Sequence, residues 1–210
     1  AYPAMLAAID GATRSVAMSS YIFGADVSGQ QFIAALQRAV ERGVAVRVLI
    51  DAVGLLYTRP SSFSALQRAG VPVARFLPLL SATGTAFFNL RNHRKLLIID
   101  GHTAFTGGMN IADRHVIALG QQAATRDVHF KLEGPIAMQL LAAFAEDWAF
   151  ATRELLDGPE WRTEPPPRGP TLARTITNGP DEDFEVVRHV LLGAIAAARQ
   201  SVSVVTPYFL

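Results

Sequence analysis

The stretch NHRKLLIIDGHTAFTGGMN, at residues 92–110, contains two apolar runs separated by a turn signal. Residues 95–99 and 103–106 are rich in large or β-branched side chains, and the Asp100-Gly101 pair between them is typical of a tight turn between two strands. The stretch therefore predicts two strands joined by a short turn.

Helical and strand-like patterns alternate on both sides of these strands. The alternation favours a largely parallel sheet with helices on both faces, which is an α/β fold, more narrowly an α/β/α sandwich with a mixed, largely parallel sheet. A helix is also expected to start near Asn110. The remaining expected helices are 2–13, 30–42, 62–68 and 135–156, and the remaining strands are 15–23, 44–51, 71–76 and 127–133.

The chain divides into three parts. Residues 1–156 form a first module, and residues 157–170, DGPEWRTEPPPRGP, are dense in proline and glycine and are expected to be a linker. Residues 171–210 are expected to begin a second, truncated module, with strands at 171–177 and 201–206 and a helix at 184–199. A shift of 186 residues supports this division, because it aligns AIDGATRSVAMSSYIF with AIAAARQSVSVVTPYF.

Composition excludes several kinds of chemistry. The chain has 210 residues, a formal net charge of +1 and no cysteine, so disulfides and thiolate catalysis are excluded. Nucleic acid is an unlikely partner, since no basic track for phosphates is present. Only Lys95 and Lys131 of the 19 basic residues are lysines, so a lysine at any position is informative.

His93 and Lys95 are the first candidates for chemistry. They lie two residues apart at the entry to a strand, so their side chains project from the same face. A neutral imidazole can attack phosphorus while a neighbouring ammonium neutralises the oxygens of the phosphate. This pair therefore indicates phosphoryl chemistry.

Several residues after this pair could support the chemistry of His93 and Lys95. Asp100 has the opposite parity, so it is better placed to fix the turn or hold a neighbouring ligand than to accept a proton from His93. Gly107 and Gly108 allow the backbone to approach a ligand closely. Asn110 can donate to a phosphate and cap the next helix.

The spacing His93-x-Lys95-x4-Asp100-x6-Gly107-Gly108-x-Asn110 resembles the HxKxxxxD motif of the phospholipase D superfamily. The flanking sequence is similar to bacterial cardiolipin synthases and their phosphatidyltransferase relatives. Segments that carry this similarity are 19–23, 42–54, 91–101, 105–114 and 126–135.

The resemblance implies a phospholipase-D-like fold and a site shared by two motifs, without cofactor or metal. By this resemblance His93 forms a phosphohistidine or, alternatively, serves as the acid–base partner. Lys95 and Asn110 bind phosphate together with the glycine pair, and Asp100 is structural or supports the site. Asp127, in the R-D-x-H stretch, is expected to orient an active-site imidazole.

The sequence departs from the family pattern at two points. Gly108 stands where many superfamily members have serine. Only one His-x-Lys motif occurs, so the second motif is expected from a missing C-terminal half or from a homodimer partner, and the isolated chain is expected to be weakly active or inactive.

The implied function is transfer of a phosphatidyl group, with a phosphatidylglycerol-like phospholipid as substrate and an alcohol as acceptor. The alternatives are a hydrolytic phospholipase D, a dimeric single-motif nuclease, and a non-catalytic lipid-binding module. We expect a cytoplasmic protein or a peripheral protein of the inner membrane. Loop residues Phe87, Phe88 and Leu90 are candidates for a lipid contact, with simple loop packing as the alternative.

Other polar residues have simpler interpretations. Asp100 could be a plain turn aspartate and Asp127 a surface ion-pair residue. His129 is expected to pack in the core or at the surface. His102, His115 and His189 are expected to be exposed. Asp113, His115 and His102 lack the close helical spacing of a metal site.

Overall fold

The computed structural model describes residues 1–58, 60–77, 91–119, 124–177 and 185–204. The chain forms two compact units, Ala1–Ala173 and Arg174–Leu210. The first unit carries the sheet and every candidate site residue that the structure describes.

A six-stranded sheet in the order β3-β2-β1-β4-β5-β6 forms the centre of the first unit. β1, β2 and β3 pair in parallel, whereas β4, β5 and β6 continue the sheet in antiparallel pairs. The expected α/β class with a mixed sheet is confirmed. The sheet is not largely parallel, since three of its five strand pairings are antiparallel. The strands are β1 Ser15–Ser20, β2 Ala45–Asp51, β3 Val73–Phe76, β4 Leu96–Ile99, β5 Thr103–Gly107 and β6 His129–Glu133.

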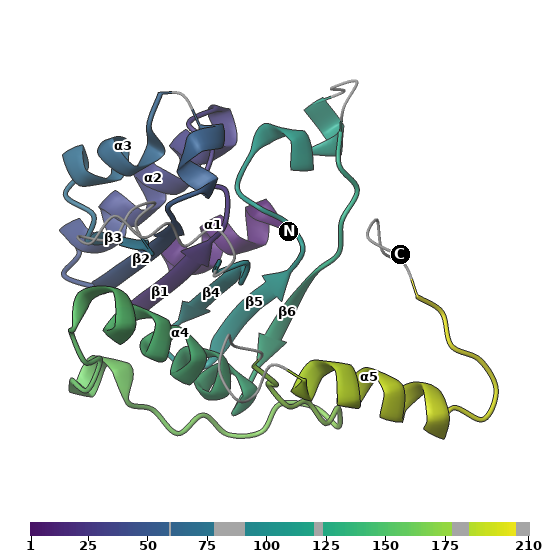
Figure 1. Ribbon diagram of the computed structural model, residues 1–210. Coiled ribbons are helices and arrows are strands. Elements are labelled where there is room, and N and C mark those ends of the chain that lie inside the picture. The colour runs from purple at the N-terminus through teal and green to yellow at the C-terminus, as the bar shows by residue number, and fades with distance from the viewer. Residues whose placement is uncertain (59, 78–90, 120–123, 178–184, 205–210) are drawn as a thin grey trace, which may run out of the picture. The chain divides into compact units, whose positions relative to one another are not determined.

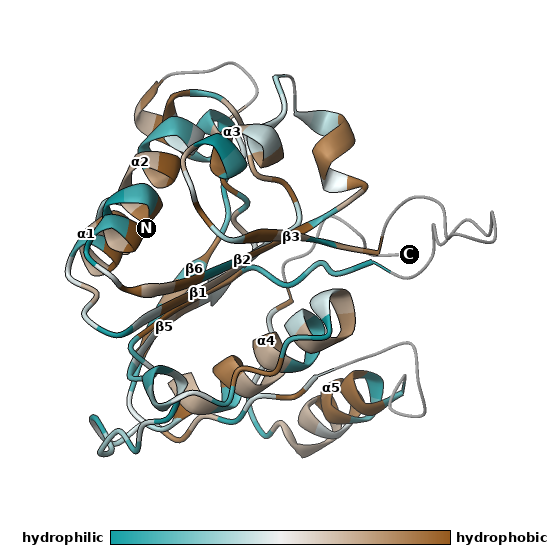
Figure 2. Cartoon of the chain, turned by 90° about the vertical axis from the view of Figure 1, so that its left-hand side faces the viewer, coloured by the Kyte–Doolittle hydropathy of each residue, from teal (hydrophilic) through white to brown (hydrophobic). Residues whose placement is uncertain are grey.

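Helices cover both faces of this sheet, as Figures 1 and 2 show. α1, α2 and α3 lie on one face, where Phe23, Phe32 and Leu36 belong to the larger buried cluster. α4 lies on the opposite face with a second cluster around Phe144 and Trp148. The helices are α1 Tyr2–Asp10, α2 Val27–Glu41, α3 Ser62–Arg68 and α4 Ile136–Thr152.

Local signals explain where these helices begin and end. The side chain of Asp26 caps α2 by accepting a hydrogen bond from the amide of Gly29. Gly43 follows α2 with a φ of +82°, a conformation that glycine adopts without steric cost. In α4, the buried residues Leu140, Phe144 and Trp148 recur every four positions, so one face of the helix packs on the sheet.

The expected helix start near Asn110 is wrong. The chain stays extended there and forms a parallel bridge between Phe23 and Ile111. The Ile111 amide donates to the carbonyl of Ile22, which lies 89 positions earlier in the sequence. This long-range pairing forms in place of the expected helix. The first helical turn after it is the 3₁₀ helix η2, Asp113–His115.

The second unit contains one helix among its described residues, α5 Val186–Ala197, which agrees with the expected helix. The expected strands at 171–177 and 201–206 are not seen at 171–177 or at 201–204, and residues 205 and 206 lie outside the described part. A strand requires a hydrogen-bonded neighbour, and the structure pairs neither described segment with one.

Part of the expected linker packs on the first unit. Trp161, in the 3₁₀ helix η4 Pro159–Trp161, is buried in the cluster under α4. The guanidinium of Arg14 donates to the carbonyl of Pro159 and, at 2.6 Å, to that of Arg162. The boundary expected after residue 156 stays a prediction, and these contacts tie residues 159–162 to the first unit.

Among the described residues, every helix is too short or too polar to span a membrane.

Candidate active site

The site lies at one edge of the sheet because of its strand directions. β4 runs antiparallel to β1, so its first residue, Leu96, pairs with Ser19 near the end of β1. In the same way Gly107, the last residue of β5, pairs with His129, the first residue of β6. The segments around Tyr21, His93 and Asn110 therefore meet at the same edge.

His93 and Lys95 are brought together there, as the sequence predicts. His93 is exposed, so its imidazole can be reached by a substrate. The Lys95 ammonium donates to the His93 carbonyl oxygen at 2.7 Å. Tyr21 lies against both, with its ring stacked on the His93 imidazole at 4.0 Å between centroids and 5.5 Å from the Lys95 nitrogen. Tyr21 was missed as a site residue, because in the sequence it is only one aromatic in a strand.

The electrostatics favour a neutral imidazole at His93. Partial burial, followed by the Lys95 ammonium, lowers the pKa of His93, while the Asp51 carboxylate acts in the opposite direction. Burial also lowers the pKa of Lys95, and the charges of Asp127 and Asp51 oppose this shift. A histidine with a lowered pKa is unprotonated at neutral pH, which is the form a nucleophile needs.

Asp51, at the end of β2, fixes the chain just before His93. Its buried carboxylate accepts a hydrogen bond of 2.9 Å from the amide of Asn92 and lies 3.6 Å from the guanidinium of Arg91. It also accepts from the amide of Val53 at 2.9 Å. The end of β2 therefore fixes the position of the segment just before His93.

Asp147 in α4 fixes the same segment from the other face. Its Oδ2 accepts from the Asn92 side-chain amide at 2.7 Å and from the Arg94 guanidinium at 2.6 Å. The Asn92 side-chain oxygen in turn accepts from the Arg94 amide at 3.0 Å. Burial raises the pKa of Asp147, and the Arg94 charge opposes this. Both residues that flank His93 are therefore held by one carboxylate, which we call the Asp147 clamp.

Asn110 is buried and joins the site to the end of β1. Its side-chain oxygen accepts from the Ile22 amide at 3.0 Å, which leaves the side-chain nitrogen as the donor for a ligand. The predicted helix cap is wrong, since no helix begins here. The Asn110 side chain instead forms a hydrogen bond to the backbone just after β1.

The glycine pair leaves room for neighbouring groups. Gly107 has a φ of +155°, and a Cβ on it would lie 2.3 Å from the Val128 carbonyl oxygen. A Cβ on Gly108 would lie 2.1 Å from Oδ1 of Asp127, so the glycine that replaces the family's serine makes space for this carboxylate. Asp127 is exposed, and its Oδ1 accepts from the Val128 amide at 2.8 Å.

Asp100 lies at the opposite end of β4 from His93. Its carboxylate accepts hydrogen bonds from the amides of Thr13, Arg14 and Ser15 at 3.0, 2.8 and 2.9 Å, and from the Thr13 hydroxyl at 2.9 Å. Burial acts to raise the pKa of Asp100, but these hydrogen bonds outweigh it and lower the pKa. The geometry therefore supports a structural role for Asp100, and it does not support contact between Asp100 and a substrate.

Two histidines near Asp127, His115 and His129, have buried ring nitrogens. His115 is 7% exposed, so its expected exposure is wrong. Neither ring nitrogen of His115 or His129 has a hydrogen-bond partner among the described residues. Burial lowers the pKa of His115, and that of His129 to about 4. Burial of His115 could not be foreseen, because it depends on the fold of the chain between β5 and β6.

The expected lipid-contact residues Phe87, Phe88 and Leu90 lie outside the described residues. Within the described part of the chain, no group of three or more histidine, aspartate or glutamate side chains could hold a metal ion.

The fold and the His-x-Lys pair at the sheet edge are those of a phospholipase-D-like domain. Residues 5–148 match the family described as "Cardiolipin synthase, PLD-like domain". The chain therefore belongs to this phospholipase-D-like family.

Curated relatives agree with this assignment. The chain is 32% identical over 209 residues to the probable cardiolipin synthase YwiE of Bacillus subtilis, with 99% of the chain and 42% of the relative covered. It is 33% identical to cardiolipin synthase A of Pseudomonas entomophila, with 100% of the chain and 43% of the relative covered. The chain thus spans about two fifths of the length of these relatives.

Solved structures show the same fold. The phospholipase D family member Nuc of Salmonella typhimurium matches with a TM-score of 0.54 at 24% identity, covering 71% of this chain and 87% of that one. Phosphatidylserine synthase of Haemophilus influenzae matches with a TM-score of 0.53 at 19% identity, covering 74% of this chain and 34% of that one.

Proposed function

We propose that the protein is a phosphatidyltransferase of cardiolipin synthase type, which acts on phospholipid phosphodiesters through a phosphohistidine on His93. The single observation that carries the proposal is the exposed His93 imidazole, with its lowered pKa, stacked on Tyr21 next to the Lys95 ammonium. The family and the similarity to cardiolipin synthases support the choice of substrate.

The reaction has two steps. In the first, a ring nitrogen of His93 attacks the phosphorus of a phosphatidylglycerol-like donor, a P–N bond forms, and the P–O bond to the leaving alcohol breaks as that oxygen takes up a proton. In the second, the hydroxyl of the acceptor alcohol loses its proton and attacks phosphorus, and the P–N bond breaks. Lys95 and the amide of Asn110 stabilise the phosphate oxygens as charge develops on them.

A second group must donate a proton to the leaving alcohol and remove one from the acceptor alcohol. We propose that a second histidine, either from a longer chain or from a second copy as its own His93, protonates the leaving alcohol and deprotonates the acceptor. The sequence supports this, since it contains one His-x-Lys motif. Asp127 and Asp100 are a positioning and a structural residue in this scheme, and the protein acts at a membrane surface as a peripheral protein.

The experiment compares three substrates. The protein is expressed from its complete reading frame, together with its His93→Ala variant, and each is incubated with vesicles of phosphatidylglycerol, vesicles of phosphatidylethanolamine, and DNA. The proposal predicts cardiolipin from phosphatidylglycerol and its loss in the variant. Release of phosphatidic acid without cardiolipin would indicate a hydrolytic phospholipase D, and cleavage of DNA without lipid turnover would indicate a nuclease. No turnover of any substrate would indicate a non-catalytic module.

A further inference from the structure

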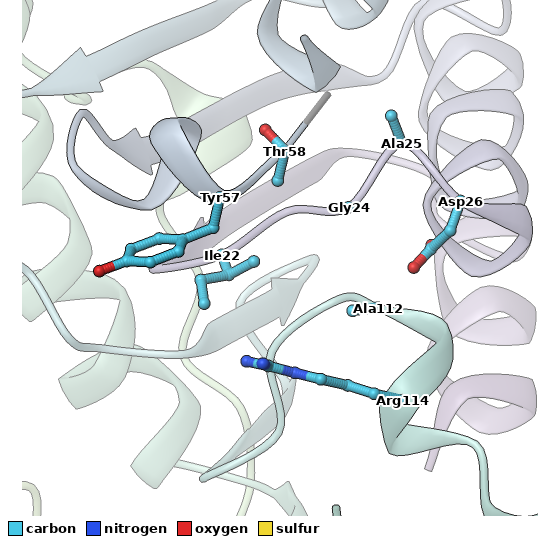
Figure 3. A pocket seen from close by; sticks show the side chains of 8 residues that line it. All are labelled: Ile22, Gly24, Ala25, Asp26, Tyr57, Thr58, Ala112 and Arg114. Carbon is cyan, nitrogen blue, oxygen red and sulfur yellow. The ribbon is translucent and has the colours of Figure 1, made fainter. Parts of the chain in front are cut away.

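The first unit has a pocket of about 210 Å³, whose lining side chains are shown in Figure 3. This is below the roughly 300–1,000 Å³ of sites that hold drug-sized ligands, so it suits a small polar head group better than an acyl chain. Its lining residues are Ile22, Gly24, Ala25, Asp26, Tyr57, Thr58, Ala112 and Arg114.

The pocket is built on the same two segments as the site. Ile22 follows Tyr21, which stacks on His93, and its amide donates to the side chain of Asn110. The Gly24 amide donates to the carbonyl of Ile111 at 2.6 Å, which joins the two segments on the pocket side. A ligand in the pocket would therefore lie next to the segments that carry Tyr21 and Asn110.

Arg114 gives the pocket a positive charge. Its side chain is exposed and extends along the pocket (Figure 3). Among the described residues, no side chain forms a hydrogen bond or ion pair with its guanidinium. A guanidinium can bind a phosphate through two parallel hydrogen bonds.

The carboxylates near Arg114 accept hydrogen bonds from backbone amides. Asp26 accepts from the amides of Gly29 and Asp113, at 3.0 and 2.7 Å. Asp113 accepts from the amide of Ser28 at 2.7 Å. Both carboxylates therefore hold the wall of the pocket, and the guanidinium is available to an anion.

The Tyr57 phenol adds a donor at the same opening. Its side chain lines the pocket and the residue is 69% exposed, so the hydroxyl is accessible to a ligand. Together, a guanidinium and a phenol suit an oxygen-rich anion with hydroxyl groups.

We propose that the pocket binds the head group of the acceptor phospholipid, with Arg114 on the acceptor's own phosphate. The inference rests on the proposed function and deepens it. When the acceptor is itself a glycerol phospholipid, its attacking hydroxyl is only a few bonds from a second phosphodiester. Lys95 and Asn110 bind the phosphate that is transferred. The acceptor's own phosphate therefore needs a different cation, and Arg114 supplies it.

The test measures acceptor preference. The protein from the complete reading frame is given phosphatidylglycerol as donor in vesicles, and transfer to an anionic acceptor, phosphatidylglycerol, is compared with transfer to a neutral one, free glycerol, in labelled form. In Arg114→Gln the ratio of anionic to neutral transfer should fall at least tenfold, and Arg114→Lys should recover part of it. Arg68→Gln, on the exposed surface of α3, is the matched control and should leave the ratio unchanged.

The outcomes separate the two proposals. An unchanged ratio in Arg114→Gln overturns the acceptor pocket and leaves the phosphatidyltransferase intact. No transfer to either acceptor by the unsubstituted protein overturns the proposed function and, with it, the pocket.

A binding measurement provides a readout without turnover. Glycerol 3-phosphate is titrated calorimetrically into His93→Ala and into His93→Ala/Arg114→Gln. The second variant should bind at least tenfold more weakly, and equal affinity of the two would overturn the assignment of Arg114.

Discussion

Oδ2 of Asp147 accepts a hydrogen bond of 2.6 Å from the guanidinium of Arg94. The same oxygen accepts from the side chain of Asn92, so α4 holds the residues on both sides of His93. We infer that Asp147 is a positioning residue, which acts on the imidazole through its neighbours without touching substrate.

Asp147→Asn should therefore lower kcat by about 10–100-fold, since a displacement of about 1 Å at a reacting group can cost this much. KM should change by less than threefold, because the variant alters the nucleophile and not the substrate contacts. Steady-state kinetics on phosphatidylglycerol vesicles measure both constants. Glu146→Gln, at the exposed neighbouring position, is the control. A wild-type kcat in Asp147→Asn would remove the clamp from the mechanism.

Asp100 should matter for stability. Asp100→Ala leaves three backbone amides and the Thr13 hydroxyl without their acceptor, and we expect a loss of about 3 kcal/mol in the free energy of unfolding. Thr13→Val removes only the hydroxyl and should cost about 1 kcal/mol. Urea denaturation followed by circular dichroism measures both. If the two variants are equally stable, the carboxylate does not anchor the start of β1.

Gly108 should not accept a side chain. Gly108→Ser places a Cβ where the Asp127 carboxylate lies, so the carboxylate must move away from the site. We expect kcat/KM to fall at least tenfold with little change in melting temperature, since Asp127 is exposed. Gly193→Ser, at an open position of α5, serves as the control. Full activity in Gly108→Ser would show that the position of Asp127 is unimportant.

Stability should fall as the pH is lowered, because His129 is held neutral in the folded protein. The pKa of His129 is lowered to about 4 in the folded state, from about 6.5. Between these values the unfolded chain binds more protons than the folded one, so the free energy of unfolding decreases as pH falls through this window. The decrease should be on the order of 1–3 kcal/mol.

The control for this effect is His129→Asn. Asp147 acts with the opposite sign, because its pKa is raised by burial, but its contribution is present in both proteins and cancels in the difference. Denaturation at pH 7, 6 and 5 should give a steeper decline for the unsubstituted protein than for His129→Asn. Parallel declines would show that His129 is not buried in neutral form.

The sequence predicted the fold well where the signal is local. The alternation of apolar runs and helical patterns gave α3 with its exact bounds and the other helices and strands of the sheet within a few residues. His93 and Lys95 were found because their side chains share one strand face, which depends only on a spacing of two residues.

The features that escaped prediction depend on contacts between distant segments. Asn110 was interpreted as a helix cap, but its side chain bonds Ile22, 88 positions earlier. Asp147 is one acid among many in a helical pattern, and only the packing of α4 on the sheet brings it to Arg94. Burial of His115 likewise follows from tertiary structure.

The phosphohistidine on His93 is the central claim, and a trapping experiment tests it most directly. The protein from the complete reading frame is mixed with phosphatidylglycerol carrying ³²P, quenched within its first turnover, and digested for mass spectrometry. We predict ³²P on the peptide that contains His93, attached through an acid-labile, base-stable P–N bond, and its absence from His93→Ala, which should also lose at least a thousandfold in lipid turnover. Undiminished turnover by His93→Ala, or label on another residue with none on His93, would contradict the account.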